Sequence, residues 1–214
     1  FIANRVGIFS MLAIMHHAKQ FSLGFDVVDK LTGTLIGRPK SATFRTADLV
    51  GLDILSHVID TMQTTLTDDP WHTYYTAPVW LKTLIEQGAL GQKTGKGIYQ
   101  KMGKEIHVLD PATNTYRLSE DALNSDIESL LKQKNPVEKF LALRSSEHPQ
   151  AKFVLAIHRD LFHYCAVHLP AIADNTRDLD LAIRWGFGWN QGPFEIWQTA
   201  GWNQIVAWLE EDIA

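Results

Sequence analysis

Hydrophobic residues recur at helical intervals along most of the chain. Near the amino terminus, apolar side chains at positions 2, 6, 9 and 13 form one helical stripe, and those at positions 8, 11 and 15 form a second. A helix that is apolar nearly all round is typical of a protein interior, so residues 1–21 predict a buried helix. The same spacing predicts further helices over 26–36, 44–62, 79–87, 149–169, 178–186, 193–200 and 202–212.

Capping and turn residues predict where several of these helices begin and end. Asp53 is a good N-cap and predicts that the 44–62 helix restarts there. Pro78 and Gly88 bracket the apolar stretch between them, as expected for the first turn and the end of a helix. Asn135 followed by Pro136 predicts the start of another helix.

Residues 97–118 follow a different pattern. Short β-favouring runs alternate with turn signals at Met102-Gly103 and Asp110-Pro111, which predicts two or three antiparallel strands. The expected fold is therefore mainly α, with a small antiparallel β insertion. We expect three parts: a first helical repeat at 1–99, the β insertion with connecting helices at 100–148, and a second helical repeat at 149–214.

Two segments share the spacing of an aspartate, two glycines and a phenylalanine. In both, the aspartate lies eight residues before the first glycine, and the phenylalanine lies seven residues before the second. The two sets are Asp29, Gly37, Phe44 and Gly51, and Asp180, Gly188, Phe194 and Gly201. The pattern indicates a repeated unit in which a glycine ends a helix, a proline-containing turn follows, and a second helix ends in glycine.

The repeat extends upstream on weaker similarity. The stretch FIANR at residues 1–5 matches LAIHR at residues 155–159, which makes Asn4 and His158 equivalent. Two copies of one helical unit predict an intrachain version of a symmetric dimer, in which residues 1–60 and about 152–212 superpose by a twofold-like rotation.

Composition and charge narrow the class of protein. The chain has 214 residues, of which 45% are hydrophobic and 21% charged, and its net charge is −4, so a phosphate-rich polyanion such as nucleic acid is not the expected partner. There is no run of 18 apolar residues and no signal-peptide pattern. The single cysteine, Cys165, is expected as a buried structural thiol in a reducing, cytoplasmic setting. Because the chain opens at Phe1 inside a helical pattern, we expect it to be a fragment of a longer polypeptide.

Several motifs resemble one enzyme family. FIANR is similar to a phenylalanine-x-x-asparagine-arginine motif, KTGKGIY at 93–99 to a lysine-threonine-glycine-x-glycine-aromatic motif, and GFGWNQGPFE at 186–195 to a repeated glycine–proline turn. In this order they resemble the C-terminal domain of the 3-hydroxyacyl-CoA dehydrogenases, of the multifunctional bacterial fatty-acid oxidation type. The resemblance implies a duplicated helical domain of the 6-phosphogluconate dehydrogenase C-terminal-like class. The first copy departs from the family pattern, since GRPKSATF at 37–44 replaces a glycine-proline-phenylalanine turn.

The resemblance also implies a function. This chain is expected to be the substrate-binding and dimerisation-type part of an enzyme that oxidises 3-hydroxyacyl-CoA to 3-ketoacyl-CoA with NAD. NAD and the catalytic histidine–glutamate pair belong to an N-terminal Rossmann domain that this sequence does not contain, and no GxGxxG motif occurs here. The expected partners are the 3-hydroxyacyl-CoA substrate and that Rossmann domain. The resemblance leaves open whether a hydratase domain lies on the same polypeptide, as in multifunctional members of the family. The isolated chain is expected to be inactive.

The resemblance carries one catalytic role onto this sequence, that of Asn4, whose amide would hold the oxygen at the reacting end of the substrate. The alternative is that Asn4 only caps the first helix. Pro39, Lys93 and Lys96 are the other expected substrate contacts, the two lysines through CoA phosphates, although GQKTGKG at 91–97 is read as a turn and not as a phosphate loop.

Two further sets of side chains are expected to be structural. The histidines at 158, 163 and 168 lie five residues apart and cannot all face one metal ion, so no metal site is predicted. The tryptophans at 185, 189 and 197 are expected to fill the core. The competing hypothesis for the whole chain is a non-catalytic helical packing module that holds neighbouring domains together.

Overall fold

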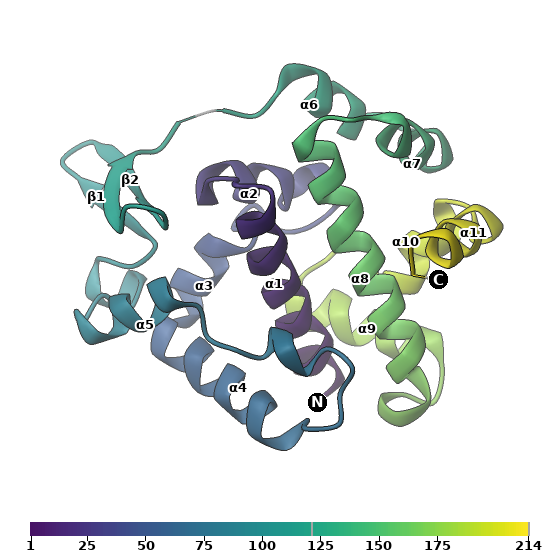
Figure 1. Ribbon diagram of the computed structural model, residues 1–214, viewed down its shortest axis with the longest axis horizontal. Helices are drawn as coiled ribbons and strands as arrows, with labels where there is room; N and C mark the ends of the chain where they lie inside the picture. Colours follow the sequence, from purple (N-terminus) through teal and green to yellow (C-terminus); the bar gives the residue numbers. More distant parts are fainter. Residues whose placement is uncertain (121, 214) are drawn as a thin grey trace.

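The computed structural model describes residues 1–120 and 122–213, which form eleven α-helices, three short 3-10 helices and one antiparallel sheet (Figure 1). The first half contains α1 (Ile2–Gln20), α2 (Phe25–Leu31), η1 (Thr34–Ile36), α3 (Phe44–Val50), α4 (Leu52–Thr65), η2 (His72–Tyr74), α5 (Val79–Glu86) and η3 (Gln92–Thr94). The sheet follows as β1 (Tyr99–Met102), β2 (Glu105–Asp110) and β3 (Thr115–Leu118). The second half contains α6 (Ser125–Leu131), α7 (Pro136–Ser145), α8 (Pro149–Ile172), α9 (Thr176–Phe187), α10 (Pro193–Thr199) and α11 (Trp202–Ile213).

Helices α1 and α8 lie side by side at the centre and run antiparallel (Figure 1). Phe9 near the start of α1 stacks on Tyr164 of α8, with ring centroids 3.7 Å apart. Near the other end of α1, the imidazole Nε2 of His17 lies 2.7 Å from the Oδ2 atom of Asp160. This pair of helices joins the two halves of the chain through aromatic packing and buried polar contacts.

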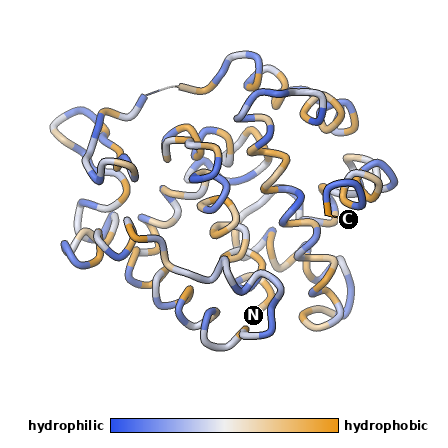
Figure 2. The backbone as a smooth tube through the Cα atoms, in the orientation of Figure 1, coloured by the Kyte–Doolittle hydropathy of each residue, from blue (hydrophilic) through white to orange (hydrophobic). Residues whose placement is uncertain are grey.

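The remaining elements lie on either side of the central pair. Helices α2 to α5 and the sheet lie on the α1 side, while α7, α10 and α11 lie beyond α8 (Figure 1). Figure 2 shows that the outer turns of the sheet are largely hydrophilic, whereas the central helices carry long hydrophobic stretches. The prediction that 1–21 forms a buried helix is confirmed, because most residues of α1 are buried.

The sheet has the order β1-β2-β3, with both neighbouring pairs antiparallel. The two or three strands predicted within 97–118 are therefore confirmed as three. Tyr99 on β1 donates a hydrogen bond from its hydroxyl to Asp29 at 2.9 Å, and Arg117 on β3 pairs with Asp26 at 2.8 Å. Both aspartates lie on α2, so the sheet is fixed against the first half of the chain.

Helix ends agree with most of the capping predictions. Asn135 accepts hydrogen bonds from the backbone N–H groups of Val137 and Glu138, as its position before Pro136 predicts. The prediction that Asp53 is an N-cap is wrong, because α4 begins at Leu52 with Gly51 as its N-cap and no side-chain cap. Other predicted helices have different lengths. The helix expected over 26–36 ends at Leu31, because the chain turns at Thr32 and Gly33 into the separate 3-10 turn η1. Helix α8 continues three residues past 169 through Pro170, since a proline in the last turn removes only one backbone donor.

The repeated aspartate has the same role in both copies. Asp29 at the end of α2 accepts hydrogen bonds from the backbone N–H groups that begin α3, including that of Phe44 at 2.7 Å. Asp180 on α9 accepts them from Phe194 at 2.8 Å and Glu195 at 3.1 Å at the start of α10. Carboxylates satisfy the free N–H groups of a helix start and interact favourably with its dipole. The helix order is also the same in both copies.

The two repeated turns contact each other reciprocally. The first glycine of each turn has a left-handed backbone, with φ of 75° at Gly37 and 66° at Gly188. The carbonyl oxygen of Gly37 accepts a hydrogen bond from the backbone N–H of Asn190 at 2.8 Å, and a Cβ at Gly188 would lie 3.2 Å from the ring of Pro39. Each glycine thus contacts the residue two positions after its counterpart, as a twofold relation requires. The division at residues 99 and 148 stays a prediction, since α1 also packs closely on α8 and α9.

Candidate active site

A cavity of about 380 Å³ lies beside the amino-terminal half of α1. Helix α1 contributes Asn4, Gly7, Ile8 and Met11, which recur at helical spacing, together with Ser10. The other walls come from the turn before α3, from α3 and α4, and from the end of α9 with Trp189. Its lining residues from those parts are Arg38, Pro39, Ser41, Ala42, Thr43, Thr46, Ala47, Val50, Ile54, Leu55, Val58, Gly186, Phe187 and Trp189.

Close contact between α1 and α9 shapes this cavity. A Cβ at Gly7 would overlap the ring of Phe187, and a Cβ at Gly186 would lie 2.7 Å from the Cβ of Ala3. The two glycines therefore let the helices approach more closely than larger residues permit. As a result, a wall from the second repeat closes a cavity whose floor belongs to the first.

Asn4 is exposed and lines this cavity from the first turn of α1. The N-cap of α1 is Phe1, and no side chain caps that helix. The alternative role of Asn4 as a helix cap is therefore wrong. Within the described residues the carboxamide of Asn4 has no hydrogen-bond partner, which leaves its N–H groups and its oxygen available to a ligand.

Pro39 lines the same cavity, one residue after Arg38. The guanidinium carbon of Arg38 lies over the indole of Trp189, 3.8 Å from the ring centroid. Trp189 and Arg38 each follow the first glycine of a repeated turn, so this stacked pair lies where the two copies meet. The structure thus places Asn4, Pro39 and the junction of the repeats around one cavity.

Lys93 and Lys96 lie elsewhere, on the KTGKG segment. Lys93 donates hydrogen bonds to both carboxylate oxygens of Asp53, at 2.6 and 2.7 Å, and Lys96 lies over the ring of Tyr116. Neither lysine lines the cavity. The ammonium of Lys93 nevertheless lies close to Gly51, which falls between two cavity-lining residues, Val50 and Ile54.

The KTGKG segment serves as a structural clasp. Asp48 on α3 accepts hydrogen bonds from the backbone N–H groups of Ile98 and Tyr99, both at 2.8 Å. A Cβ at Gly97 would overlap this carboxylate and lie 2.5 Å from the Cα of Gly91. Gly91 and Gly97 are thus explained by the close approach of the loop to α3, and the interpretation of GQKTGKG as a turn is consistent with this geometry.

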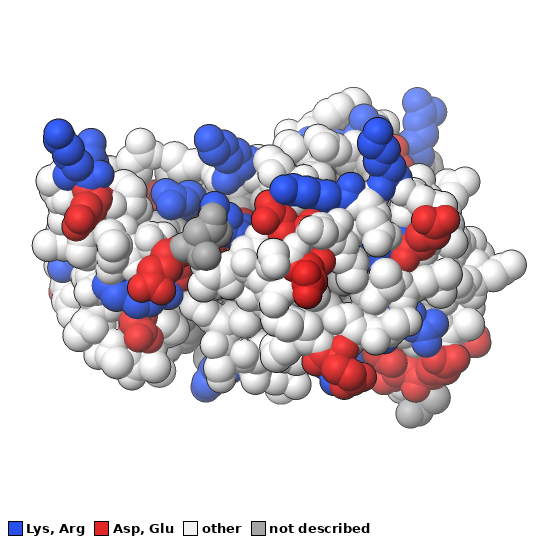
Figure 3. Space-filling view, turned by 90° about the horizontal axis from the view of Figure 1, so that it is seen from above, with Lys and Arg blue, Asp and Glu red and all other residues white. Residues whose placement is uncertain are grey.

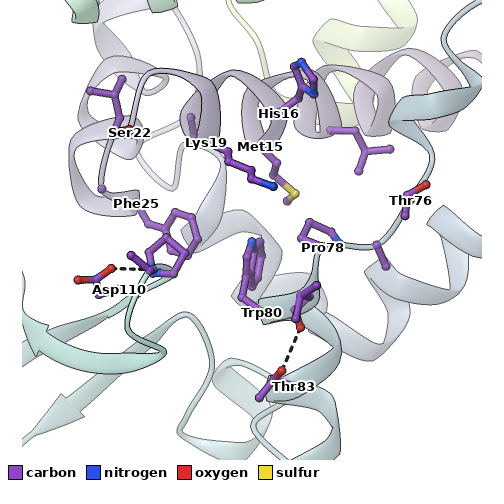
Figure 4. A pocket seen from close by; sticks show the side chains of 18 of the residues that line it. Met15, His16, Lys19, Ser22, Phe25, Thr76, Pro78, Trp80, Thr83 and Asp110 are labelled. Atoms are coloured by element: carbon purple, nitrogen blue, oxygen red, sulfur yellow. Dashed lines mark hydrogen bonds between the residues drawn. The ribbon is translucent and has the colours of Figure 1, made fainter.

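A second, larger cavity of about 750 Å³ lies between the carboxyl-terminal half of α1, α5 and the β2–β3 turn. Figure 4 shows the side chains of Met15, Lys19 and Trp80 directed into this space, with Phe25 on one side and Pro78 on the other. None of the predicted site residues lines it. The smaller cavity is therefore the stronger candidate for the active site, because Asn4 and Pro39 both line it.

Charges on the visible molecular surface are mixed. Lysine and arginine side chains alternate with aspartate and glutamate across the face in Figure 3, without a continuous basic area. Across residues 1–120 and 122–213, no helix is both long and apolar enough to span a membrane. In the same part of the chain, no group of three or more His, Cys, Asp or Glu side chains is placed to hold a metal ion.

Two side chains, Trp185 and His158, differ from the sequence-based interpretation. Trp189 and Trp197 are buried, but the prediction that Trp185 fills the core is wrong, because it is 79% exposed. Helical spacing explains this, since Leu179 and Ile183 mark the buried face of α9 and Trp185 lies on the opposite face. His158 is buried beside Phe140 and its Nδ1 atom donates to the carbonyl of Val154 at 2.7 Å, so it does not reproduce the exposed position of Asn4.

The cavity residue that sequence reasoning missed is Arg38. It is 7% exposed, and within the described residues its guanidinium has neither a hydrogen bond nor an ion pair. When the two repeats are aligned at Gly37 and Gly188, Arg38 and Trp189 occupy equivalent positions. This equivalence is the feature of the sequence from which their contact could have been predicted.

Comparison with known proteins agrees with these observations. Residues 1–101 match the family model described as 3-hydroxyacyl-CoA dehydrogenase, C-terminal domain. A probable 3-hydroxyacyl-CoA dehydrogenase of Bacillus subtilis is 37% identical over 211 residues, covering 99% of this chain and 27% of that protein. A putative fatty acid oxidation complex trifunctional enzyme of Rickettsia prowazekii is 28% identical over 217 residues, covering 96% of this chain and 28% of that protein.

A solved structure shares the fold. The crystal structure of 3-hydroxybutyryl-CoA dehydrogenase from Escherichia coli superposes with a TM-score of 0.60 at 16% identity, over 100% of this chain and 55% of that one. The chain thus spans between a quarter and a third of the length of the two relatives above. Residues 1–101 therefore form the C-terminal domain of the 3-hydroxyacyl-CoA dehydrogenase family.

Proposed function

We propose that this chain is the substrate-binding helical part of an enzyme that oxidises 3-hydroxyacyl-CoA to 3-ketoacyl-CoA. The observation that carries the proposal is the position of Asn4, which lies exposed on the cavity-lining face of α1 and caps no helix. The apolar walls formed by Ile8, Met11 and Leu55 suit an acyl chain beside this amide.

Asn4 would act through its side-chain N–H groups. During the oxidation, the C3 hydroxyl loses its proton to a base and C3 loses a hydride, so negative charge builds on the C3 oxygen until the ketone forms. A carboxamide N–H that donates a hydrogen bond to that oxygen stabilises the charge and orients C3 of the substrate. Removal of one such donor from other enzymes costs about 2.7–4 kcal/mol in transition-state free energy.

The redox part of the reaction lies outside this sequence in our proposal. NAD, when bound by a Rossmann domain of the longer polypeptide, supplies the hydride acceptor, and that domain also supplies the base. The described sheet is wholly antiparallel, so this part of the chain has no βαβ unit of the kind that holds a dinucleotide. Exposed apolar side chains at Leu49, Val50 and Ile54 border the cavity side of α3 and α4 and offer a surface for such a domain.

Further contacts complete the proposal. Pro39 would form part of the acyl wall, and Lys93 and Lys96 would contact CoA phosphates at the rim of the site. A hydratase domain on the same polypeptide and a cytoplasmic location are consistent with fatty-acid oxidation, which the name of the Rickettsia prowazekii relative mentions.

The test joins this chain to the preceding part of the Bacillus subtilis relative and measures NADH formation from 3-hydroxybutyryl-CoA. We expect the Asn4→Ala variant of this fusion to lose about 100-fold or more in kcat, with its melting temperature nearly unchanged. Asn203→Ala is the matched control, since Asn203 is an exposed asparagine on α11 outside both cavities, and it should retain full activity.

The competing packing-module hypothesis predicts a different result. If Asn4→Ala turns over as fast as the unaltered fusion, Asn4 has no part in the chemistry and the proposal is wrong. An unaltered fusion that folds, binds NAD and still fails to oxidise the substrate would also contradict it.

A further inference from the structure

Arg38 is a buried cation without a counterion. It is 7% exposed, its Nη2 atom is buried without a hydrogen-bond partner in the described residues, and its guanidinium carbon lies 3.8 Å from the ring centroid of Trp189. Burial lowers the pKa of Arg38 to about 9, so the guanidinium stays positively charged at neutral pH. A ring face does not replace the hydrogen bonds that five N–H donors lose when they leave water.

The cavity around Arg38 has a defined chemical character. Among the described residues in its lining, Arg38 is the only one with a charge, and the other walls are mainly aliphatic or aromatic. A buried cation at a mainly apolar cavity fits a ligand with one anionic group and a hydrocarbon body. A dianionic phosphate would meet no second cation there.

We propose that this cavity binds an aliphatic carboxylate, with the carboxylate paired to the guanidinium of Arg38 and the chain against the apolar walls. A carboxylate suits the planar guanidinium, because its two oxygens accept two parallel N–H hydrogen bonds. The contact with Trp189 restrains the guanidinium before the ligand arrives, which reduces the entropy lost on binding. The volume of about 380 Å³ lies within the usual range of small-molecule pockets.

The proposed ligand site overlaps the proposed substrate site. Asn4 and Arg38 line one cavity, so a bound fatty acid would occupy space assigned to the acyl group. In this respect the inference rests on the proposed function, and it predicts that free fatty acids compete with the acyl-CoA substrate. Carboxylate binding itself is independent of catalysis and is measured on the 214-residue chain.

Calorimetric titration of the chain with octanoate, 1-octanol and inorganic phosphate tests the inference. We expect octanoate to bind at least tenfold more tightly than 1-octanol, and phosphate to bind at least tenfold more weakly than octanoate. Arg38→Gln should weaken octanoate binding at least tenfold and leave 1-octanol binding unchanged. Arg45→Gln is the matched control, since Arg45 also stacks on a ring, that of Tyr99, but lies outside the cavity.

Several outcomes would overturn the inference. Octanoate that binds no better than 1-octanol shows that no cation contributes, and this comparison needs no variant to fold. Phosphate that binds as tightly as octanoate shows a general anion site without a hydrocarbon pocket. Equal octanoate binding by Arg38→Gln and the unaltered chain places the carboxylate elsewhere. Inhibition of the fusion enzyme by octanoate separates the two proposals, since binding without inhibition contradicts only the shared site.

Discussion

Replacing Gly97 by alanine should destabilise the chain more than the same replacement at Gly95 in the same motif. Gly97 has an ordinary backbone conformation, but its Cβ would overlap the carboxylate of Asp48. Gly95 has a left-handed backbone with φ of 70°, yet a Cβ there would meet no atom within 4 Å. The pair separates the cost of crowding from the cost of backbone strain.

The expected size of the effect follows from the contacts of Asp48. A Cβ at residue 97 displaces the carboxylate, which accepts hydrogen bonds from Ile98 and Tyr99 at 2.8 Å each. Hydrogen bonds to a charged group contribute about 1.5–3 kcal/mol each, so at the lower end of that range their loss destabilises the fold by about 3 kcal/mol. At Gly95 the left-handed conformation alone costs an alanine about 1–2 kcal/mol.

Urea denaturation, followed by far-ultraviolet circular dichroism, measures the free energy of unfolding of the unaltered chain and of each of the two variants. Gly103→Ala serves as a second control, because Gly103 also has positive φ and no atom within 4 Å of its added Cβ. Its free energy of unfolding should fall by about as much as that of Gly95→Ala. If Gly97→Ala is no more destabilising than Gly95→Ala, the loop does not approach α3 as closely as described. The interpretation that Asp48 holds the KTGKG segment against α3 would then be wrong.

Two further predictions concern α8 and the contact between α1 and α9. Burial lowers the pKa of His158 to about 4, so the unfolded chain binds a proton at this residue more readily than the folded chain does. The free energy of unfolding therefore falls by about 3 kcal/mol as the pH is lowered from above 6.5 towards 4. His158→Leu should therefore lose about 3 kcal/mol less than the unaltered chain between pH 7 and pH 4 in urea denaturation, and an equal loss would contradict this origin. Gly186→Ala should clash with Ala3, and the double variant with Ala3→Gly should recover at least 1 kcal/mol in a thermodynamic cycle, whereas strict additivity would refute the contact.

Local signals in the sequence predicted much of the fold. Asn135 before Pro136 defined a helix start because an N-cap acts on its immediate neighbours. The repeated aspartate–glycine spacing made Asp29 and Asp180 equivalent, and each accepts hydrogen bonds from the backbone N–H groups at the start of the next helix of its copy. Such short-range geometry depends on residue type and spacing alone.

The site depended on contacts that spacing does not encode. Arg38 and Trp189 are 151 positions apart in the sequence and meet only because the two turns pack against each other. Lys93 and Lys96 follow the family motif, yet the first is paired with Asp53 and neither lines the cavity. The size of Trp185 predicts a core position, although the helical spacing of α9 places this side chain in solvent.

The most direct test of the central claim is a crystal structure of the fusion enzyme with a bound 3-ketoacyl-CoA. The proposal predicts that the acyl group lies in the cavity between α1 and α9, with the side-chain nitrogen of Asn4 about 3 Å from the C3 oxygen. An acyl group seated instead in the larger cavity beside Lys19 and Trp80, with Asn4 free of the ligand, would contradict it.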